Sequence, residues 1–144
     1  MDCIFCKIVN GKIPTRKIIE TEKSLAFLDA FPLTKGHTLV IPKKHYTKIQ
    51  EMNRDDNTDL FETVRILAGR MEHFSTSSLV AVHNGKESGQ EVPHVHVHII
   101  PRSANDGAGP VHSMFSKRPK LSDIEFEDIA QKLRSKNYVA KSLE

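Results

Sequence analysis

The sequence lacks several features that would identify common classes of protein. It has no tryptophan, and its two cysteines, Cys3 and Cys6, are too close together to build a framework of structural disulfides. No apolar run approaches the ~18 residues that a membrane helix requires. The first residues have neither the basic stretch nor the apolar core of a signal peptide. We therefore expect a cytoplasmic location, with the nucleus as a second compartment, and no membrane partner.

A strong charge of either sign is also lacking. The chain has 21 Lys and Arg against 18 Asp and Glu, a net charge of +3, and the only basic cluster is short, at residues 117–120. Nucleic-acid binding requires a concentrated basic patch, so we expect no nucleic-acid partner. A length of 144 residues fits one domain. We expect a single domain over residues 1–144, with a core at about 3–102 and a C-terminal arm and helix at 103–144.

The hydrophobic pattern predicts short strands and a few helices. Helices are expected at residues 4–9, from about 55 to 74, and from 122 to about 135. Asn53 or Asp55 is suited to cap the long helix, and Ser122 with Glu125 has the spacing of a capping box. Strands are expected at residues 18–19, 24–28, 38–41, 79–82 and 95–100, the last one stopped by Pro101. Short connections between strands favour an α+β fold with a mostly antiparallel sheet.

Three of the eight histidines alternate within five residues, at His94, His96 and His98. Alternate side chains of a strand share one face, so the three imidazoles would follow one another at intervals of roughly 6.6–6.8 Å. The intervening residues would then face the core: Val95, Val97 and Ile99. Three imidazoles on a half-buried face indicate binding or catalysis, because a set of solvated histidines has no reason to keep this period.

The histidines alone allow two kinds of chemistry. They could ligate a catalytic zinc ion with an open position for water. Alternatively, one imidazole is a nucleophile, and its neighbours keep it neutral because they disfavour its protonation. The preceding loop, residues 85–90, contains two glycines and can direct backbone N–H groups at an anion. An anion cradle beside a nucleophile favours phosphoryl or nucleotidyl transfer.

Residues 89–102, GQEVPHVHVHIIPR, closely resemble the signature of the histidine triad (HIT) nucleotide hydrolases. The resemblance continues at residues 3–8 (CIFCKI), 26–29 (AFLD) and 35–45 (KGHTLVIPKKH), and covers roughly residues 3–102. It implies a HIT-like fold with a five-stranded, mostly antiparallel sheet and helices packed on it. It also implies a homodimer whose sheets join across the interface, and a reaction that needs no catalytic metal.

The resemblance assigns roles to the triad. His96 would attack the α-phosphorus of a nucleotide and form a nucleotidyl-imidazole, which water then hydrolyses. His98 would bind the phosphoryl oxygens, and the backbone of His94 would orient the ring of His96. Gly89 and Val92 would offer backbone N–H groups to the phosphate.

The resemblance also implies a nucleoside site. Asp29 would accept hydrogen bonds from the ribose hydroxyls, and His37 would lie behind the triad as a hydrogen-bond partner. An apolar set would wall the base, although each member alone is equally typical of an ordinary core: Phe5, Ile8, Ile13, Phe27 and Ala30.

Two positions depart from the family pattern. His83 stands where relatives usually carry Asn or Gln that contacts phosphate, and it is either a further phosphate ligand or an ordinary residue at a strand end. Glu91 stands where many relatives have Ser or Thr near the leaving group. A carboxylate there would repel a polyphosphate and favour an amine leaving group.

The Cys3-x-x-Cys6 pair alone is consistent with a redox pair, a metal site or ordinary helix residues. A branch of the HIT family with this N-terminal motif binds structural zinc. The resemblance therefore implies one zinc ion per chain with a Cys2His2 ligand set: Cys3, Cys6, His45 and His94.

The function expected from the sequence is hydrolysis at the α-phosphate of a purine nucleotide conjugate of the adenosine 5′-phosphoramidate type. Three alternatives remain at this point. They are a dinucleoside polyphosphate hydrolase, a metalloenzyme with zinc in the triad, and a nucleotide-binding regulatory module with residual activity. The expected partners are a purine nucleotide and a second copy of the chain.

Overall fold

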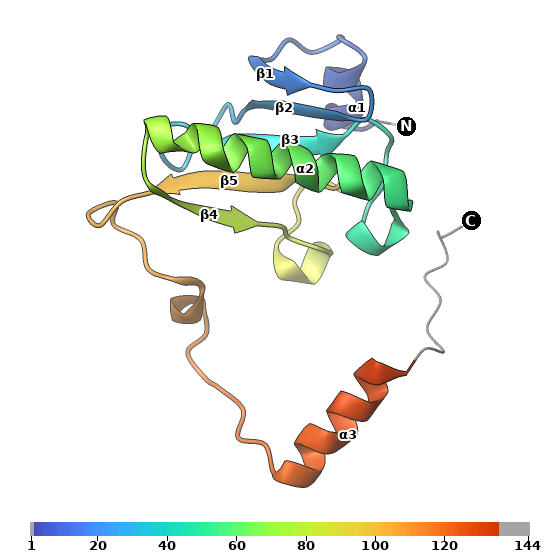
Figure 1. Ribbon diagram of the computed structural model, residues 1–144, viewed down its shortest axis with the longest axis vertical. Coiled ribbons are helices and arrows are strands. Elements are labelled where there is room, and N and C mark those ends of the chain that lie inside the picture. The colour runs from blue at the N-terminus through green and yellow to red at the C-terminus, as the bar shows by residue number, and fades with distance from the viewer. Residues whose placement is uncertain (1, 136–144) are drawn as a thin grey trace.

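A computed structural model describes residues 2–135, which form a sheet with helices on it and a long C-terminal arm (Figure 1). The sheet has five strands in the order β1-β2-β3-β5-β4, and every neighbouring pair is antiparallel. The strands are β1 (Lys17–Glu20), β2 (Ser24–Leu28), β3 (Thr38–Pro42), β4 (Ser77–Ala81) and β5 (Val97–Arg102). The α+β fold expected from the sequence is thus confirmed.

One face of the sheet is covered by the long helix α2 (Arg54–Arg70), which is followed by the short 3-10 helix Met71–His73 (Figure 1). Asn53 caps the helix, because its side chain accepts a hydrogen bond from the Asp56 N–H. The buried stripe of α2 includes Leu60, Val64 and Leu67, at helical spacing. It packs against one face of the strands, represented by Val40 and Val97. The burial of each such side chain stabilises the fold by about 1.5–3 kcal/mol.

The opposite face of the sheet packs against the short helix α1 (Ile4–Val9). Phe5 and Ile8 of α1 lie against alternate residues of β2 and β3, such as Phe27 and Leu39, which pair with each other in the sheet. Because strand side chains alternate between faces, Ala26 and Val40 turn to α2 while Phe27 and Leu39 turn to α1. The α1 face is the one on which the functional residues gather.

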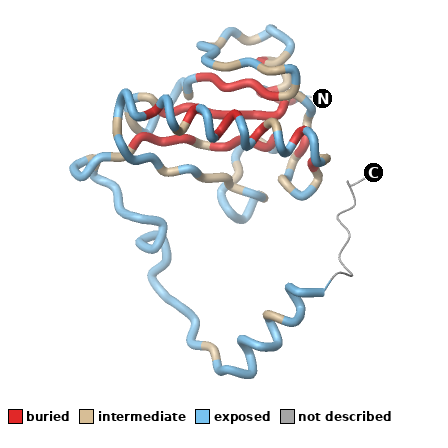
Figure 2. Tube along the Cα trace, in the orientation of Figure 1, coloured by how far each residue is buried: buried red, intermediate tan, exposed pale blue. Residues whose placement is uncertain are grey.

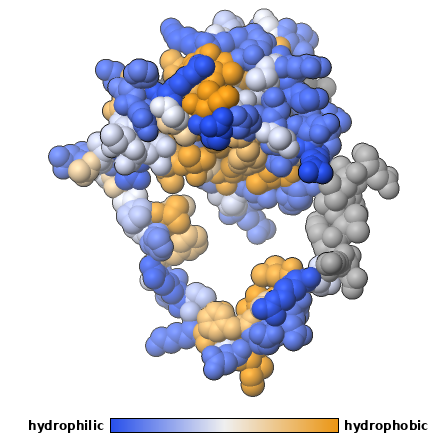
Figure 3. Space-filling view, in the orientation of Figure 1, coloured by the Kyte–Doolittle hydropathy of each residue, from blue (hydrophilic) through white to orange (hydrophobic). Residues whose placement is uncertain are grey.

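The chain then leaves the sheet as an extended arm that carries two short helices. These are the 3-10 helix η4 (Val111–Met114) and the helix α3 (Asp123–Arg134), which lies well away from the sheet (Figure 1). The arm is exposed along almost its whole length (Figure 2). Apolar side chains of α3 face solvent, with Ile124 and Leu133 both 82% exposed (Figure 3). Ser122 and Glu125 form a complete capping box at its start.

Most predicted elements are confirmed, with differences at their ends. The helix at 4–9 and the strand at 24–28 have the expected bounds, whereas α2 ends at Arg70 rather than near residue 74. The strand expected at 95–100 is wrong at both ends, since β5 begins at Val97 and continues through Pro101 to Arg102. Residues 136–144 of the predicted arm lie outside the described part of the chain. Within residues 2–135, no helix is long and apolar enough to cross a membrane.

Candidate active site

The histidine run straddles the start of β5. Because the strand begins at Val97, His94 and His96 lie in the segment before it, and only His98 is a strand residue. The rings therefore do not follow the even strand spacing that the sequence predicts, and the centroids of His96 and His98 are 5.0 Å apart. The predicted inward positions are confirmed, since Val95, Val97 and Ile99 are buried.

His96 has one ring nitrogen fixed by the backbone and one available. Its Nδ1 lies 2.8 Å from the carbonyl oxygen of His94, an acceptor, so Nδ1 carries the proton and Nε2 keeps its lone pair. The ring is 6% exposed and packs edge-on against Phe5, with centroids 5.1 Å apart. Burial lowers the pKa of His96 below its ordinary value, and nearby His83 lowers it further. A neutral imidazole with a free Nε2 is a nucleophile.

His98 is oriented by a chain of hydrogen bonds that starts at the backbone. The Leu33 N–H donates to His37 Nδ1 at 3.0 Å, which leaves the proton of the neutral His37 ring on Nε2. His37 Nε2 then donates to His98 Nδ1 at 2.9 Å. The proton of His98 is thereby placed on Nε2, and the ring becomes a hydrogen-bond donor toward the cavity. Burial and the neighbouring imidazoles lower the pKa of His98 to about 4, so this ring is neutral at pH 7.

Asp29 is close to this chain but not part of it. Its Oδ2 is 3.5 Å from His37 Nε2, and its Oδ1 accepts a hydrogen bond from the Phe31 N–H at 2.8 Å. Ligand atoms of Asp29, His37 and His98 lie within 4.8 Å of one another, which is close enough for a metal ion. However, His37 and His98 are hydrogen-bonded directly to each other, so we interpret these three residues as part of a hydrogen-bonded network and not as a metal site.

A cavity of about 530 Å³ opens in front of His96 and His98, on the α1 face of the sheet. All the nucleotide-binding residues expected from the sequence line it. These are Phe5, Ile8, Ile13, Phe27, Asp29, Ala30, His37, His83, Gly89, Glu91 and Val92. Its size and mixed lining of apolar walls with a few convergent polar groups are typical of small-molecule sites.

The two backbone donors expected for a phosphate differ in the structure. The Gly89 N–H already donates to the Lys86 carbonyl oxygen at 3.0 Å. The Val92 N–H has no backbone or side-chain acceptor within residues 2–135. Gly89 has a φ of 102°, a backbone conformation that favours glycine, whereas a Cβ built there would make only an ordinary contact with the His83 ring, at 3.6 Å. Val92 is thus the better backbone donor of the two.

His83 and Glu91, the two departures from the family pattern, both line this cavity. The His83 ring packs edge-on against His98, with centroids 5.5 Å apart. Glu91 also lines a neighbouring cavity of about 950 Å³, between Lys48 and the loop that includes Gly85. Both residues are close enough to His96 to affect its protonation, His83 lowering its pKa and Glu91 raising it.

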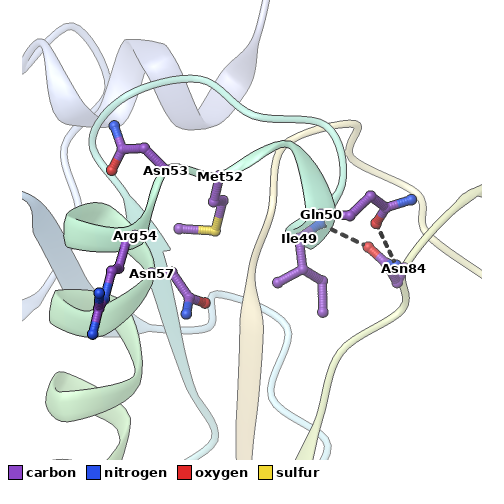
Figure 4. A pocket seen from close by; sticks show the side chains of 7 residues that line it. All are labelled: Ile49, Gln50, Met52, Asn53, Arg54, Asn57 and Asn84. Carbon is purple, nitrogen blue, oxygen red and sulfur yellow. Dashed lines mark hydrogen bonds between the residues drawn. The ribbon is translucent and has the colours of Figure 1, made fainter. Parts of the chain in front are cut away.

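A third cavity, of about 610 Å³, lies farther away beside the start of α2 (Figure 4). Asn84 closes one side of it, accepting from the Ile49 N–H at 2.9 Å and donating to Gln50 Oε1 at 3.0 Å. None of the seven side chains around it is a nucleophile or a metal ligand of the His, Cys, Asp or Glu type. It is not a candidate for chemistry.

Cys3, Cys6, His45 and His94 converge on a single point on the other side of His94. Nδ1 of His94 is 3.5 Å from Cys3 Sγ, 3.6 Å from Cys6 Sγ and 3.2 Å from His45 Nδ1. Zinc ligands in a tetrahedron, with Zn–S near 2.3 Å and Zn–N near 2.1 Å, stand about 3.3–3.8 Å apart. His94 Nε2 donates to the Pro42 carbonyl oxygen at 2.8 Å, which leaves Nδ1 bare for a metal. The donor set therefore fits zinc.

Sequence reasoning missed part of the cavity wall and, in the neighbouring cavity, Lys48 and Phe115. Phe31 and Leu33 line the rim of the first cavity while being 88% and 73% exposed. Apolar residues directly after Asp29, in a segment with no strand pattern, were the signal that could have identified them. Lys48 and Phe115 carry no such signal, because they meet only in the folded chain.

Comparisons with known proteins agree with this geometry. The HIT domain family matches residues 10–105. The Schizosaccharomyces pombe protein adenosine 5′-monophosphoramidase hnt1 is 39% identical over 137 residues, which cover 93% of this chain and 100% of that one.

Two crystal structures are similar to most of the chain. A HIT family protein from Bacillus subtilis matches with a TM-score of 0.84 and 34% identity, over 96% of this chain and 99% of that one. A Zn-bound histidine triad family protein from Mycobacterium smegmatis matches with a TM-score of 0.70 and 34% identity, over 74% of this chain and 79% of that one. The second match, together with the Cys/His cluster, supports the zinc-containing branch.

Proposed function

Since this chain belongs to the HIT family, we propose that it hydrolyses the P–N bond of an adenosine 5′-phosphoramidate through a covalent intermediate on His96. The observation that carries the proposal is the protonation of the His96 ring. The His94 carbonyl oxygen holds the proton on Nδ1, so Nε2 faces the cavity as a nucleophile. The S. pombe phosphoramidase, similar along almost the whole chain, supports the choice of substrate.

In the first half of the reaction, His96 Nε2 attacks the α-phosphorus. A bond forms between Nε2 and phosphorus, the P–N bond to the amine breaks, and the amine takes a proton from solvent as it leaves. His98 Nε2–H and the Val92 N–H donate to the phosphoryl oxygens and stabilise the charge that develops on them. Glu91, at the cavity mouth, suits an amine leaving group better than an anionic one.

In the second half, water attacks the phosphorus of the nucleotidyl-imidazole. The bond between phosphorus and Nε2 breaks, AMP leaves, and His96 recovers its lone pair. The proton that water loses replaces the one that the amine took from solvent. All these steps use side chains and backbone groups of the chain itself, and none needs a catalytic metal.

The nucleoside would occupy the apolar part of the same cavity. Phe5 and Phe27 lie edge-on, with ring centroids 5.9 Å apart, and would wall the purine with Ile8, Ile13 and Ala30. Asp29 keeps Oδ2 available for the ribose hydroxyls, since Phe31 occupies Oδ1. His83 would donate to a phosphoryl oxygen from beside His98.

We further propose that Cys3, Cys6, His45 and His94 hold one zinc ion. When bound, the ion would join α1 to His45, which follows β3, and to His94, the first residue of the histidine run. It would thereby stabilise the fold. We also propose that the chain forms a homodimer, which light scattering during gel filtration would measure.

The decisive experiment is to trap the intermediate. Purified protein is mixed with adenosine 5′-phosphoramidate, quenched in base, digested and analysed by mass spectrometry for AMP on His96. An adduct together with AMP release supports the proposal. Faster AMP release from diadenosine polyphosphates than from the phosphoramidate would instead identify the chain as a dinucleoside polyphosphate hydrolase. Tight AMP binding with no adduct and no turnover would favour a regulatory module.

A further inference from the structure

The segment that carries the Val92 N–H is held by a hydrogen bond at each of its ends. After Val92, the Val95 N–H donates to the Tyr46 carbonyl oxygen at 2.7 Å. Before Val92, the Gln90 side chain donates from Nε2 to the Thr47 carbonyl oxygen at 2.8 Å. The two acceptors belong to consecutive residues, so the residues between Gln90 and Val95 span the space between neighbouring carbonyl groups. The Val92 N–H lies within this span.

Gln90 also closes the loop that precedes it. Its Oε1 accepts a hydrogen bond from the Gly85 N–H at 2.8 Å, and its own N–H donates to the Gly85 carbonyl oxygen at 3.3 Å. One side-chain amide thus uses its oxygen on the loop and its nitrogen on Thr47, because glutamine has an acceptor and a donor on the same group. Gln90 is partly buried, so water competes less for these bonds than it would at an exposed site.

The segment that accepts the Gln90 hydrogen bond is fixed by contacts of its own. Glu51 Oε2 accepts from the Thr47 N–H at 2.9 Å and from the Lys48 N–H at 3.2 Å. These bonds satisfy N–H groups at the start of the short 3-10 helix Ile49–Glu51. Gln90 therefore connects the loop to a segment whose backbone is already hydrogen-bonded.

Asn84 makes the corresponding connection at the other end of the loop. Its Oδ1 accepts from the Ile49 N–H at 2.9 Å, and its Nδ2 donates to Gln50 Oε1 at 3.0 Å (Figure 4). Neither Asn84 nor Gln90 lines the cavity in front of His96, so their contribution to binding there is indirect. Any effect of these two amides on the reaction must pass through the loop that they hold.

We propose that Gln90 and Asn84 are positioning residues that keep the Val92 N–H directed at the bound phosphate. The inference rests on the proposed function, in which this N–H stabilises the charge that develops on the phosphoryl oxygens. A donor that is held in place before the reaction stabilises that charge without having to be ordered during it. Gln90 has the larger share, because it is bonded two residues before Val92 and fixes both the loop and its support.

The test measures kcat with adenosine 5′-phosphoramidate, the dissociation constants of AMP and of adenosine, and Tm. Gln90→Met keeps the length of the side chain and removes both of its hydrogen bonds. We expect kcat to fall by about 10–100-fold and AMP to bind about tenfold more weakly, while the affinity for adenosine changes by less than about twofold. Asn84→Leu should give the same pattern with a smaller effect. A matched control, Gln131→Met, removes an exposed amide of α3 and should change none of these values.

The ratio of the AMP and adenosine affinities separates positioning from a purely structural role. Equal losses for both ligands, or an unchanged affinity of Gln90→Met for AMP, would overturn the proposal. So would a wild-type chain that binds AMP no more tightly than adenosine. If Gln90→Met does not fold, Asn84→Leu decides by the same ratio. Failure of a wild type that binds AMP to cleave the phosphoramidate would instead reject the proposed function, and the two affinities would still decide the positioning role.

Discussion

His94 and His96 are two residues apart and nearly equally buried, but they use opposite ring nitrogens. His94 donates from Nε2 to Pro42 and turns its bare Nδ1 to two cysteines and His45. His96 donates from Nδ1 to the carbonyl oxygen of His94 and turns its bare Nε2 to the cavity. In each case a backbone carbonyl selects which nitrogen carries the proton. The location of that carbonyl therefore decides which ring nitrogen carries the proton and which is left bare.

The largest effect is expected from substitution of His96, the proposed nucleophile. His96→Ala should reduce kcat for adenosine 5′-phosphoramidate by about 10⁴-fold or more, because His96 Nε2 is the nucleophile of the proposed reaction and the neighbouring His98 Nε2 carries a proton. Metal content, measured by elemental analysis, should not change. Activity within tenfold of the wild type would mean that His96 is not the nucleophile.

The second largest effect is expected from substitution of Cys6, in the proposed zinc site. Cys6→Ser should abolish zinc binding and lower Tm by about 10 °C or more, since the proposed ion would join α1 to the rest of the fold. The folded variant, assayed well below its Tm, should retain turnover of the same order as the wild type. Removal of zinc from the wild type with a chelator is the control. Immediate loss of all activity on chelation would mean that the metal is catalytic.

A smaller effect sharpens the comparison by changing how His98 is protonated. His37→Gln removes the ring that donates to His98 Nδ1, so the His98 proton is no longer fixed on Nε2. We expect kcat to fall by about 10–100-fold with little change in KM, as for other residues that orient a functional imidazole. His73→Gln, at an exposed histidine, is the matched control and should have no effect.

The smallest effect is on the pH dependence of stability. The pKa of His98 is about 4 in the folded chain, against an ordinary value near 6.5, so between these values only the unfolded chain binds the proton. The free energy of unfolding should be fully retained above pH 6.5 and fall as the pH drops, by about 1 kcal/mol at pH 5.5 from this ring. His98→Asn should flatten the dependence. Equal slopes in urea titrations of the two proteins would contradict this origin.

Much of the fold could be predicted from local patterns. Apolar spacing located α2, a short apolar run next to a turn located β2, and the alternation of the histidines located the inward positions of β5. The ends of β5 could not be predicted in this way. Pro101 pairs with Ser78 of β4 and lies beyond Ile99, the last residue of β5 that pairs with β3, so a proline at this place interrupts no pairing with β3.

The candidate site likewise has features that the sequence predicts and features that it does not. The alternation of the three histidines could be read from residue type and spacing, whereas the expected nucleotide-binding residues were implied by the resemblance to the HIT family, and all of them line one cavity. Which nitrogen each imidazole presents depends on acceptors distant in the sequence, such as Pro42, or on a backbone donor such as Leu33. Lys48 and Phe115 meet in one cavity only after folding, so no pattern in the chain joins them.

His94 places its ring in one cluster and its carbonyl oxygen in the other. This has a consequence for how such a chain can change over generations. A substitution at position 94 must satisfy two requirements at once, whereas changes at Cys3 or Cys6 face only one. A lineage that lost both cysteines could keep the reaction, provided that another partner held the ring of His94 in place. We therefore expect the metal site to be gained and lost more easily than the histidine that belongs to it.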